Sequence, residues 1–434
     1  FRVGGMTNYC VDLMEQQVAQ GDNVSLLYPA NFSLGKTRIV KHKHSKYKIF
    51  AIINPLPLAL VFGINEPRRY IAKCNSDCYE KFLTSNHFDI IHVHCFMGIH
   101  KEFFEAAKNL GIPMVFTTHD YYPFCIKCNL LKKDNSICSS PDGYECRICN
   151  AGQGLSAIEE KLMQSHLYIR LKYSRLFEII RKRCRSKIEN VKDAEPTSTV
   201  EDYESLIDYN MSIIKLMDLI HCNSEVAYNV YSKFLPEANY KILPIAHNHV
   251  PSIRKDHHKK ELQTLRIGYM GGLAPYKGIN TLLEALKILD ANNKKNWELY
   301  LYGADYSGLE NDIRIHNCGK YEYGDLEGIY ESLDLTIVPS VWYETYGFIV
   351  PESLASGVPA ISSDTVGSQM LLDGCGVKLV FKSGSAESLA QTLEPLFDVS
   401  IYNSVIDWVL NNDFDISIDN HTAKIKSMYE TLRK

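Results

Sequence analysis

Short apolar runs alternate with amphipathic stretches along most of this chain of 434 residues. The runs have the length and the aliphatic content of buried strands, and several of the stretches between them have helical spacing. This alternation is typical of βαβ units around a parallel sheet. It predicts ten strands in two series, at residues 24–28, 89–94, 113–118, 218–222 and 240–244, and then at 265–270, 297–303, 334–340, 358–363 and 377–381.

A polar segment rich in histidine and lysine, residues 244–263, separates the two series. It contains no clear helical or strand pattern, so we interpret it as a linker. We predict an α/β protein with two Rossmann-like parallel-sheet domains, residues 1–248 and 249–414, and a final helix within 415–434 that completes the first. Because a Rossmann domain starts with a strand before its glycine turn, we also expect a strand, and thus a truncation, before Phe1.

Composition indicates the cellular compartment and shows that charge is unevenly distributed along the chain. Residues 1–187 carry 26 Lys and Arg against 16 Asp and Glu, whereas the whole chain has a net charge of -4. A basic first part of the chain indicates a contact with something anionic. Thirteen scattered cysteines and no signal-peptide pattern predict a cytoplasmic protein rather than a disulfide scaffold. The closest approach to a membrane span is 49–64, which is slightly short and contains two prolines.

Three glycine-containing loops are candidates for phosphate binding. Backbone N–H groups at a glycine turn before a helix attract anions, and each loop precedes a helical pattern. The first loop holds Gly4 and Gly5, the second holds Lys277, and the third holds Tyr346, Gly347 and Phe348. Three loops at the carboxyl ends of strands in two domains are expected to face one cleft.

Two glutamates, Glu344 and Glu352, flank the third loop. Carboxylates do not bind phosphate, but paired acceptor oxygens suit the vicinal hydroxyls of a ribose or a hexose. The combination indicates a nucleotide-sugar ligand, with its phosphates on backbone N–H groups and Lys277. Each residue also has a simpler interpretation: Glu352 as a carboxylate favoured at a helix start, Lys277 as surface charge and His119 as a buried core histidine. Their order and spacing together favour the functional interpretation.

The segment ETYGFIVPESLASGVPAI resembles the E-x7-E segment of retaining family 4 glycosyltransferases of the GT-B fold. The resemblance extends over nearly the whole chain through GGM, FDIIHVH, TTHDYYPFC, IGYMGGLAPYKG and PSVWYETYGF. It implies two Rossmann-like domains facing a central cleft. It also implies a hexosyl transfer from a nucleotide-diphosphate sugar of UDP or GDP type to a glycan or lipid-linked glycan, in the synthesis of cell-surface polysaccharide.

The resemblance assigns roles to individual residues. Glu344 would contact donor-sugar hydroxyls, Glu352 the ribose and Lys277 the diphosphate, while His119 would lie beside the donor sugar. The remaining expected binding positions are glycines and aromatic residues of the three loops, namely Gly4, Gly5, Gly271, Gly272, Tyr346, Gly347 and Phe348. Many family members place arginine where this chain has Gly272, so other groups are expected to meet part of the diphosphate charge.

The implied chemistry is the departure of a nucleotide diphosphate, whose growing charge preorganised donors stabilise. We identify no carboxylate as a nucleophile and expect no catalytic metal. The only Asp-x-Asp, at 413–415, is interpreted as a solvated helix start. Two alternatives remain open: another GT-B enzyme, such as a nucleotide-sugar epimerase or a phosphorylase, and a scaffold that binds sugar or lipid without catalysis.

A cysteine-rich insertion at 124–150 holds five cysteines, including two CxxC pairs. Such pairs supply zinc ligands from one turn, and a subset of family 4 glycosyltransferases has a similar insertion. Matching that pattern residue by residue predicts a structural zinc on Cys125, Cys138, Cys146 and Cys149. Cys128 falls on an apolar position there. A disulfide, an iron–sulfur cluster and free buried thiols are the rival interpretations.

A basic segment, 161–187, interleaves lysine and arginine with leucine, isoleucine and phenylalanine inside a predicted helical region, 156–215. A basic amphipathic helix can lie on an anionic bilayer, which would place the protein peripherally on the inner face of the cytoplasmic membrane. A core-packing helix with a solvated basic face explains the pattern equally well. No aromatic and arginine groove indicates nucleic acid.

Overall fold

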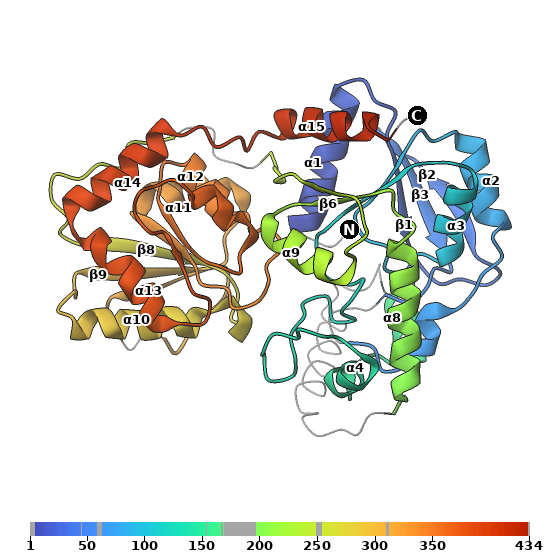
Figure 1. Cartoon of the computed structure of the whole chain (residues 1–434), viewed down its shortest axis with the longest axis horizontal. Coiled ribbons are helices and arrows are strands. Elements are labelled where there is room, and N and C mark those ends of the chain that lie inside the picture. The colour runs from blue at the N-terminus through green and yellow to red at the C-terminus, as the bar shows by residue number, and fades with distance from the viewer. Residues whose placement is uncertain are drawn as a thin grey trace. The chain divides into compact units, whose positions relative to one another are not determined.

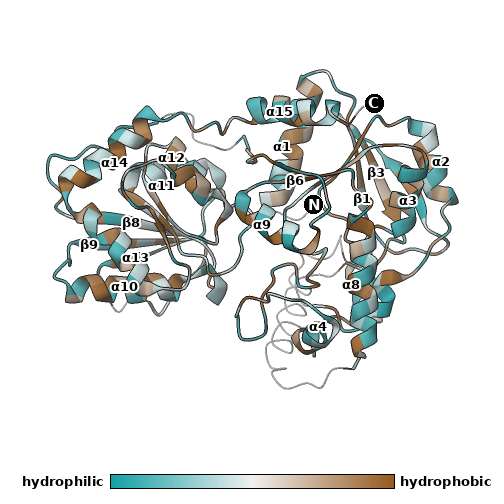
Figure 2. Ribbon diagram, in the orientation of Figure 1, coloured by the Kyte–Doolittle hydropathy of each residue, from teal (hydrophilic) through white to brown (hydrophobic). Residues whose placement is uncertain are grey.

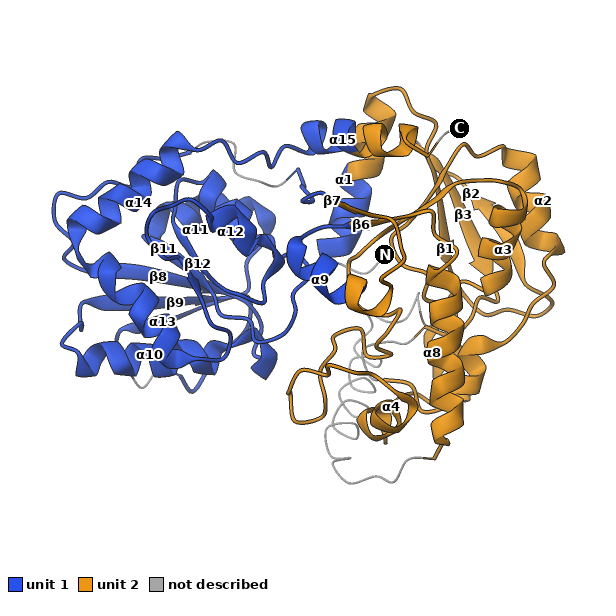
Figure 3. Cartoon of the chain, viewed as in Figure 1, with its two compact units in different colours: residues 1–12, 222–231, 242–424 blue, residues 13–221, 232–241, 425–434 orange. Residues whose placement is uncertain are grey.

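The computed structural model describes residues 5–44, 46–58, 63–152, 154–165, 168, 197–248, 254–309 and 312–432 (Figure 1). They form two compact units, which we treat separately (Figure 3). Unit 1 comprises residues 1–12, 222–231 and 242–424, and unit 2 comprises residues 13–221, 232–241 and 425–434. Three of the points of division lie in helices α1 (Gly5–Ala19), α9 (Glu225–Phe234) and α15 (Ile418–Glu430), and the other two lie in strands β6 (Leu219–Cys222) and β7 (Tyr240–Ile242).

Unit 1 is built on a parallel sheet of six strands in the order β10-β9-β8-β11-β12-β13. Counted from β8, this is the order 3-2-1-4-5-6 of the Rossmann fold. The chain therefore reverses direction across the sheet between β8 and β11. The strands are β8 (Leu265–Met270), β9 (Trp297–Tyr302), β10 (Ile315–Gly319), β11 (Leu335–Val338), β12 (Ala360–Ser363) and β13 (Val380–Phe381).

Helices of unit 1 bury an apolar stripe against this sheet. In α10 the buried leucines recur at helical spacing, at Leu282, Leu286 and Leu289, and pack in one cluster with Leu299 and Leu301 of β9. Figure 2 shows the resulting contrast between the largely brown strands and the two-coloured helices α10 and α14. The helices are α10 (Ile279–Ala291), α11 (Leu326–Ser332), α12 (Ile349–Ala355), α13 (Ala386–Leu393) and α14 (Val399–Asn411), with 3-10 turns at Pro275–Lys277, Tyr323–Asp325, Gly367–Leu372 and Glu394–Phe397.

Unit 2 contains two smaller sheets. One has the order β1-β3-β2, with β1 parallel and β2 antiparallel to β3, and the other has the order β4-β5-β6-β7. All four residues of β5 are buried, as are Phe103 and Phe104 of the neighbouring helix α3. The strands are β1 (Ser25–Pro29), β2 (Arg38–His42), β3 (Lys48–Ile53), β4 (Ile91–Val93), β5 (Met114–Thr117), β6 (Leu219–Cys222) and β7 (Tyr240–Ile242).

One helix of unit 2, α4, lies in the cysteine-rich insertion. The described helices that lie wholly within this unit are α2 (Asp77–Asn86), α3 (Lys101–Asn109), α4 (Gly143–Asn150), α5 (Ala157–Met163) and α8 (Val200–Ile214), with a 3-10 turn at Pro67–Ile71. Most of the basic segment 161–187 lies outside the described residues. Among the helices that the structure describes, none is both long and apolar enough to cross a membrane.

All ten predicted strands are present, and the described part of the chain contains three further strands, β2, β3 and β10, that were not predicted. The first part of the apolar stretch 49–64 is β3, whose last five residues are buried, so its hydrophobicity reflects a core strand. Strands β2 and β10 escaped prediction because they lie at sheet edges and are mostly exposed or half-buried, which leaves them without an apolar run.

Candidate active site

Lys277 and Glu344 meet at the point where the sheet of unit 1 reverses. Lys277 lies in the loop after β8 and Glu344 in the loop after β11, and these strands are parallel neighbours. Their carboxyl ends therefore share one edge of the sheet. The Nζ atom of Lys277 lies 2.9 Å from Oε1 of Glu344. In open α/β sheets this crevice is the usual ligand site, so the predicted pair stands where the topology expects a ligand.

Gly278 allows the two loops to come this close. It adopts a left-handed conformation with φ of 78°, and a Cβ added to it would lie 1.7 Å from the carbonyl oxygen of Pro339. One loop is also tied to the other by the N–H of Val341, which donates to the carbonyl of Tyr276 at 2.8 Å. The backbone itself therefore sets the separation between the lysine loop and the glutamate loop.

Glu344 is ionised by its surroundings. Burial of the carboxyl raises its pKa, but the charge of Lys277 and the hydroxyl of Ser340, which donates to Oε2 at 2.7 Å, outweigh that effect. The net result is a pKa below the usual value for glutamate. Glu344 therefore presents a negative charge with a cation already beside it.

The turn at Gly347 is fixed by a neighbouring loop. Gly347 has φ of 89°, and its carbonyl accepts a hydrogen bond from the Ser368 hydroxyl at 2.7 Å. The N–H of Ser368 donates to the carbonyl of Tyr346 at 2.8 Å. Tyr346 itself is only 2% exposed, so its side chain supports the turn from beneath.

Glu352, eight residues after Glu344, is buried on α12 and held at both oxygens. The hydroxyl of Tyr330 donates to Oε2 at 2.9 Å, and Nε2 of His247 lies 3.0 Å from Oε1. The ring of Phe348 packs edge-on against His247, with centroids 4.5 Å apart. A Cβ added to Gly5 would lie 3.6 Å from the Phe348 ring, so the predicted residues Gly5, Phe348 and Glu352 belong to one cluster.

Gly271 and Gly272 begin the loop after β8, and tyrosines hold both carbonyls. Tyr306 donates to the Gly271 carbonyl at 2.5 Å, and Tyr269 donates to the Gly272 carbonyl at 3.0 Å. No atom lies within 4 Å of a Cβ added to Gly272. The space for a larger side chain is thus present where this chain has glycine. Gly4 lies outside the described residues.

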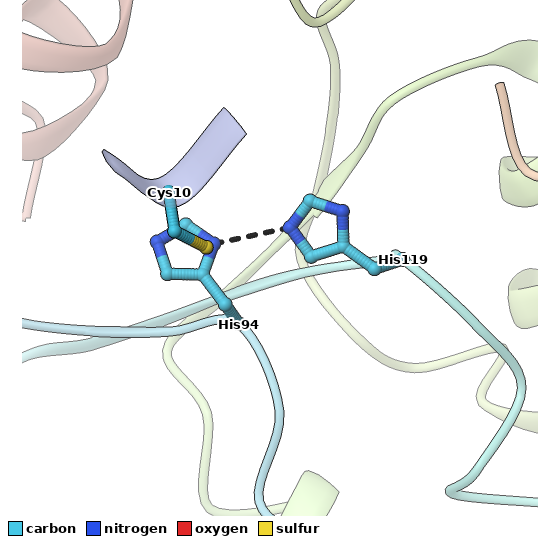
Figure 4. A group of neighbouring side chains, drawn as sticks. All are labelled: Cys10, His94 and His119. Carbon is cyan, nitrogen blue, oxygen red and sulfur yellow. Dashed lines mark hydrogen bonds between the residues drawn. The ribbon is translucent and has the colours of Figure 1, made fainter. Parts of the chain in front are cut away.

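His119 lies in unit 2, just after β5, in a group of histidines. Its Nε2 is 3.1 Å from Nδ1 of His94, which follows β4 (Figure 4). Burial lowers the pKa of both, to about 3 for His94 and well below the usual value for His119. Both rings are therefore neutral near pH 7. Nearby, Thr117 bridges His92 and His221 through its hydroxyl at 2.6 and 2.8 Å.

Sequence reasoning missed the residues that hold the glutamates. Ser340, which holds Glu344, lies within the quoted segment PSVWYETYGF, and His94, which lies beside His119, ends the quoted segment FDIIHVH, so a hydroxyl or an imidazole at a strand end was a usable signal. Tyr330 and His247 carry no such signal, because one is on the helix before β11 and the other falls in the predicted linker.

Two family models match the chain, one on each side of the predicted linker. Residues 3–151 match the family described as Glycosyltransferase Family 4, and residues 264–398 match Glycosyl transferases group 1. Among solved structures, sucrose-phosphate synthase from Thermosynechococcus elongatus matches with a TM-score of 0.58 at 14% identity, covering 99% of this chain and 94% of that one. The chain has the GT-B fold.

A second GT-B neighbour is the UDP-forming α,α-trehalose-phosphate synthase of Burkholderia xenovorans in complex with glucose-6-phosphate. It matches with a TM-score of 0.57 at 10% identity over 99% of this chain and 96% of that one. A curated relative, D-inositol 3-phosphate glycosyltransferase of Corynebacterium aurimucosum, is 24% identical over 152 residues, or 32% of this chain. The match spans 36% of that relative's length. The two family matches support the expected resemblance to family 4 glycosyltransferases.

Proposed function

We propose that this GT-B protein is a glycosyltransferase that moves a sugar from a nucleoside diphosphate to an acceptor hydroxyl. The observation that carries the proposal is the Lys277–Glu344 pair, 2.9 Å apart at the topological switch point of unit 1. A cation and an acceptor side by side suit a ligand that joins phosphate to a polyol. The glycosyltransferase matches of both parts of the chain support the same activity.

The donor is proposed to replace internal partners of these side chains. Lys277 turns from Glu344 to the diphosphate, and Glu344 then accepts hydrogen bonds from sugar hydroxyls. Glu352 accepts from the ribose while Tyr330 and His247 keep its carboxylate oriented. Because Glu352 is oriented before the ligand arrives, little of its conformational freedom is lost on binding.

The proposed reaction breaks the bond between the anomeric carbon and the diphosphate oxygen and forms a bond from the acceptor oxygen to that carbon. The acceptor's proton ends on the departing diphosphate, which leaves as the free nucleotide. Lys277 offsets the charge that develops on this leaving group. We propose retention of anomeric configuration, by resemblance to the family with the E-x7-E segment, and a hexose as the transferred sugar.

A UDP-sugar is the proposed donor, and a sugar hydroxyl is the proposed acceptor. The trehalose-phosphate synthase neighbour is named as UDP-forming and holds glucose-6-phosphate, and the curated relative is named for a phosphorylated inositol. A glycan or lipid-linked glycan acceptor in polysaccharide synthesis stays a prediction from the sequence. Sedimentation of the full chain with anionic liposomes at low salt tests the membrane part, and no binding would reject it.

The experiment begins with a thermal-shift panel of UDP, GDP and ADP and their hexose conjugates. The best donor is then incubated with sugar acceptors, and the product linkage is assigned by NMR. We expect free nucleoside diphosphate and a new glycoside of retained configuration. Inversion of the donor sugar at C4 or C2, without transfer to an acceptor, would indicate an epimerase. Binding without turnover that persists in Glu344→Gln would indicate a scaffold.

A further inference from the structure

Four cysteines of unit 2 line one small cavity, separate from the residues proposed to bind the donor. They are Cys125, Cys138, Cys146 and Cys149, and all four are buried. The cavity has a volume of about 10 Å³, close to that of a single water-sized sphere. It has room for an ion and no room for an organic ligand. None of the four takes part in a disulfide.

Three pieces of local structure bring these cysteines together. Cys125 opens a tight turn in which the N–H of Cys128 donates to its carbonyl at 2.8 Å. Cys138 follows a small hairpin closed by the bridge Leu131–Ile137, and its own N–H donates to the Leu130 carbonyl at 2.7 Å. Cys146 and Cys149 lie three residues apart on α4 and so share one face of that helix.

Backbone N–H groups near the sulfur atoms of Cys125 and Cys138 favour their thiolate form, and metal-bound thiolates need such donors to share their charge. The Cys125 sulfur faces the N–H groups of Lys127, Asn129 and Leu130. The Cys138 sulfur faces that of Ser140. The left-handed conformation of Leu130, with φ of 53°, curls the chain around Cys125 in this way.

Cys128 does not belong to the set. It is part of the first CxxC pair in the sequence, but it is absent from the lining of the cavity. Its sulfur lies 4.0 Å from the carbonyl of Ile126. The lining of the cavity therefore contains four of the five cysteines and not Cys128.

We propose that Cys125, Cys138, Cys146 and Cys149 bind one Zn²⁺ ion as four thiolates. Zinc bonds to sulfur at about 2.3 Å in a tetrahedron, which places the sulfurs about 3.8 Å apart. In the described residues no three of these sulfurs lie within 4.8 Å of one another, so binding requires them to move closer together. The ion and four thiols give four released protons and a centre of charge -2. Lys127, on the cavity wall, stands close enough to offset part of that charge.

The proposed zinc closes the chain segment that directly follows His119. The segment from Tyr121 to Asn150 contains no strand and one short helix, and turn hydrogen bonds supply most of its backbone pairing outside that helix. A bound metal would join its first turn directly to α4. Asn150 at the end of α4 then anchors the N–H of Ile64 at 2.9 Å. The inference is independent of the proposed transferase activity, since it concerns only this segment.

The test is metal analysis of the full chain expressed with zinc and purified without chelator. We expect one zinc per chain and a loss of that zinc in Cys146→Ser and Cys149→Ser. Cys128→Ser and the exposed Cys318→Ser are the matched controls, and both should keep the metal. Because a ligand variant can fail to fold, a mercurial reagent is titrated into the unmodified protein in parallel. Zinc should be released stoichiometrically as four thiols react, with a colorimetric chelator as the readout.

Cobalt substitution distinguishes the coordination. The Co²⁺ form should show the intense visible bands and the thiolate charge-transfer absorption of a tetrahedral four-sulfur site. Less than half an equivalent of zinc in the folded protein would overturn the proposal. So would iron with acid-labile sulfide, a disulfide among the four found by mass spectrometry, or zinc that Cys128→Ser removes and Cys146→Ser does not.

Discussion

Glu344 of unit 1 keeps its charge despite burial of its carboxyl, whereas burial makes the histidines His94 and His119 of unit 2 neutral. Glu344 keeps its charge because Lys277 and Ser340 compensate it, and its pKa stays below the usual value. His94 and His119 have each other as neighbours, and burial drives both to the neutral form. The comparison teaches that burial alone does not decide the charge of a site: the partner within hydrogen-bonding distance does.

The largest effect is expected from removal of Lys277, the cation that compensates the charge of Glu344. Lys277→Met leaves Glu344 buried without its cation and takes away the group proposed to meet the diphosphate. We expect kcat/KM to fall about 10³-fold in donor turnover assays. Lys287→Met is the control, because Lys287 is exposed on α10 and pairs with the likewise exposed Glu284 of the same helix. Equal losses in both variants would contradict a specific role for Lys277.

Neutralising the acid should cost less than removing the lysine. Glu344→Gln retains the shape and one acceptor oxygen, so we expect a fall in kcat/KM of about 10²-fold, carried mainly by kcat. Lys277 should stay bound to nucleoside diphosphate, which isothermal titration calorimetry with UDP can measure. If UDP affinity falls as much as turnover does, Glu344 serves binding of the nucleotide rather than the sugar.

The pH dependence of stability separates the two sites. The unfolded chain protonates histidine at about pH 6.5, whereas folded His94 does so only at about 3. The unfolded state therefore binds more protons in this window, and the free energy of unfolding falls as the pH falls. Each neutral histidine contributes a slope of up to about 1.4 kcal/mol per pH unit.

Urea unfolding between about pH 7.5 and pH 5 measures that slope. His94→Asn should flatten it, and Glu344→Gln should not, because Glu344 stays ionised throughout this range. The stability that Glu344 contributes is present above the usual glutamate pKa and is lost only as the pH falls through its lowered folded value. A slope that His94→Asn leaves unchanged would argue against a neutral buried histidine.

The smallest effect is expected at the second glutamate. Tyr330→Phe removes one hydrogen bond to Glu352 and leaves His247 in place. A loss of about 1 kcal/mol in positioning predicts a rise of about fivefold in the KM for donor, with little change in kcat. Tyr300→Phe is a suitable control, since the hydroxyl of Tyr300 donates to Glu298, another residue of β9, and not to Glu352. A fall in kcat alone would place Glu352 nearer to the reacting atoms than we propose.

The fold was largely predictable because buried strands carry continuous apolar runs. Strands such as β8 and β11 declare themselves through LRIGYM and DLTIVPS. Edge strand β2 does not, because only one of its residues is even half-buried and the rest are exposed. The sequence therefore predicts buried strands, which form the core, and misses exposed strands at sheet edges.

The site was predictable where it follows directly from strand ends. Lys277 and Glu344 stand in loops after neighbouring parallel strands, so topology alone brings them together. Tyr330 and His247 converge on Glu352 from segments 22 and 105 residues away, and no local pattern encodes such a meeting. Residues that position a functional side chain are brought to it by tertiary packing. A single sequence therefore indicates the functional side chain but not the residues that position it.

Gly278 gives the reversal point of unit 1 a fixed seam. With its missing Cβ 1.7 Å from the Pro339 carbonyl, the two loops already touch main chain to main chain. We therefore expect a bound phosphate to lie beside this contact, where Lys277 can reach it, and not between the two loops. The methyl group of Gly278→Ala would clash with the Pro339 carbonyl and push the two loops apart. We expect this to move Lys277 away from Glu344.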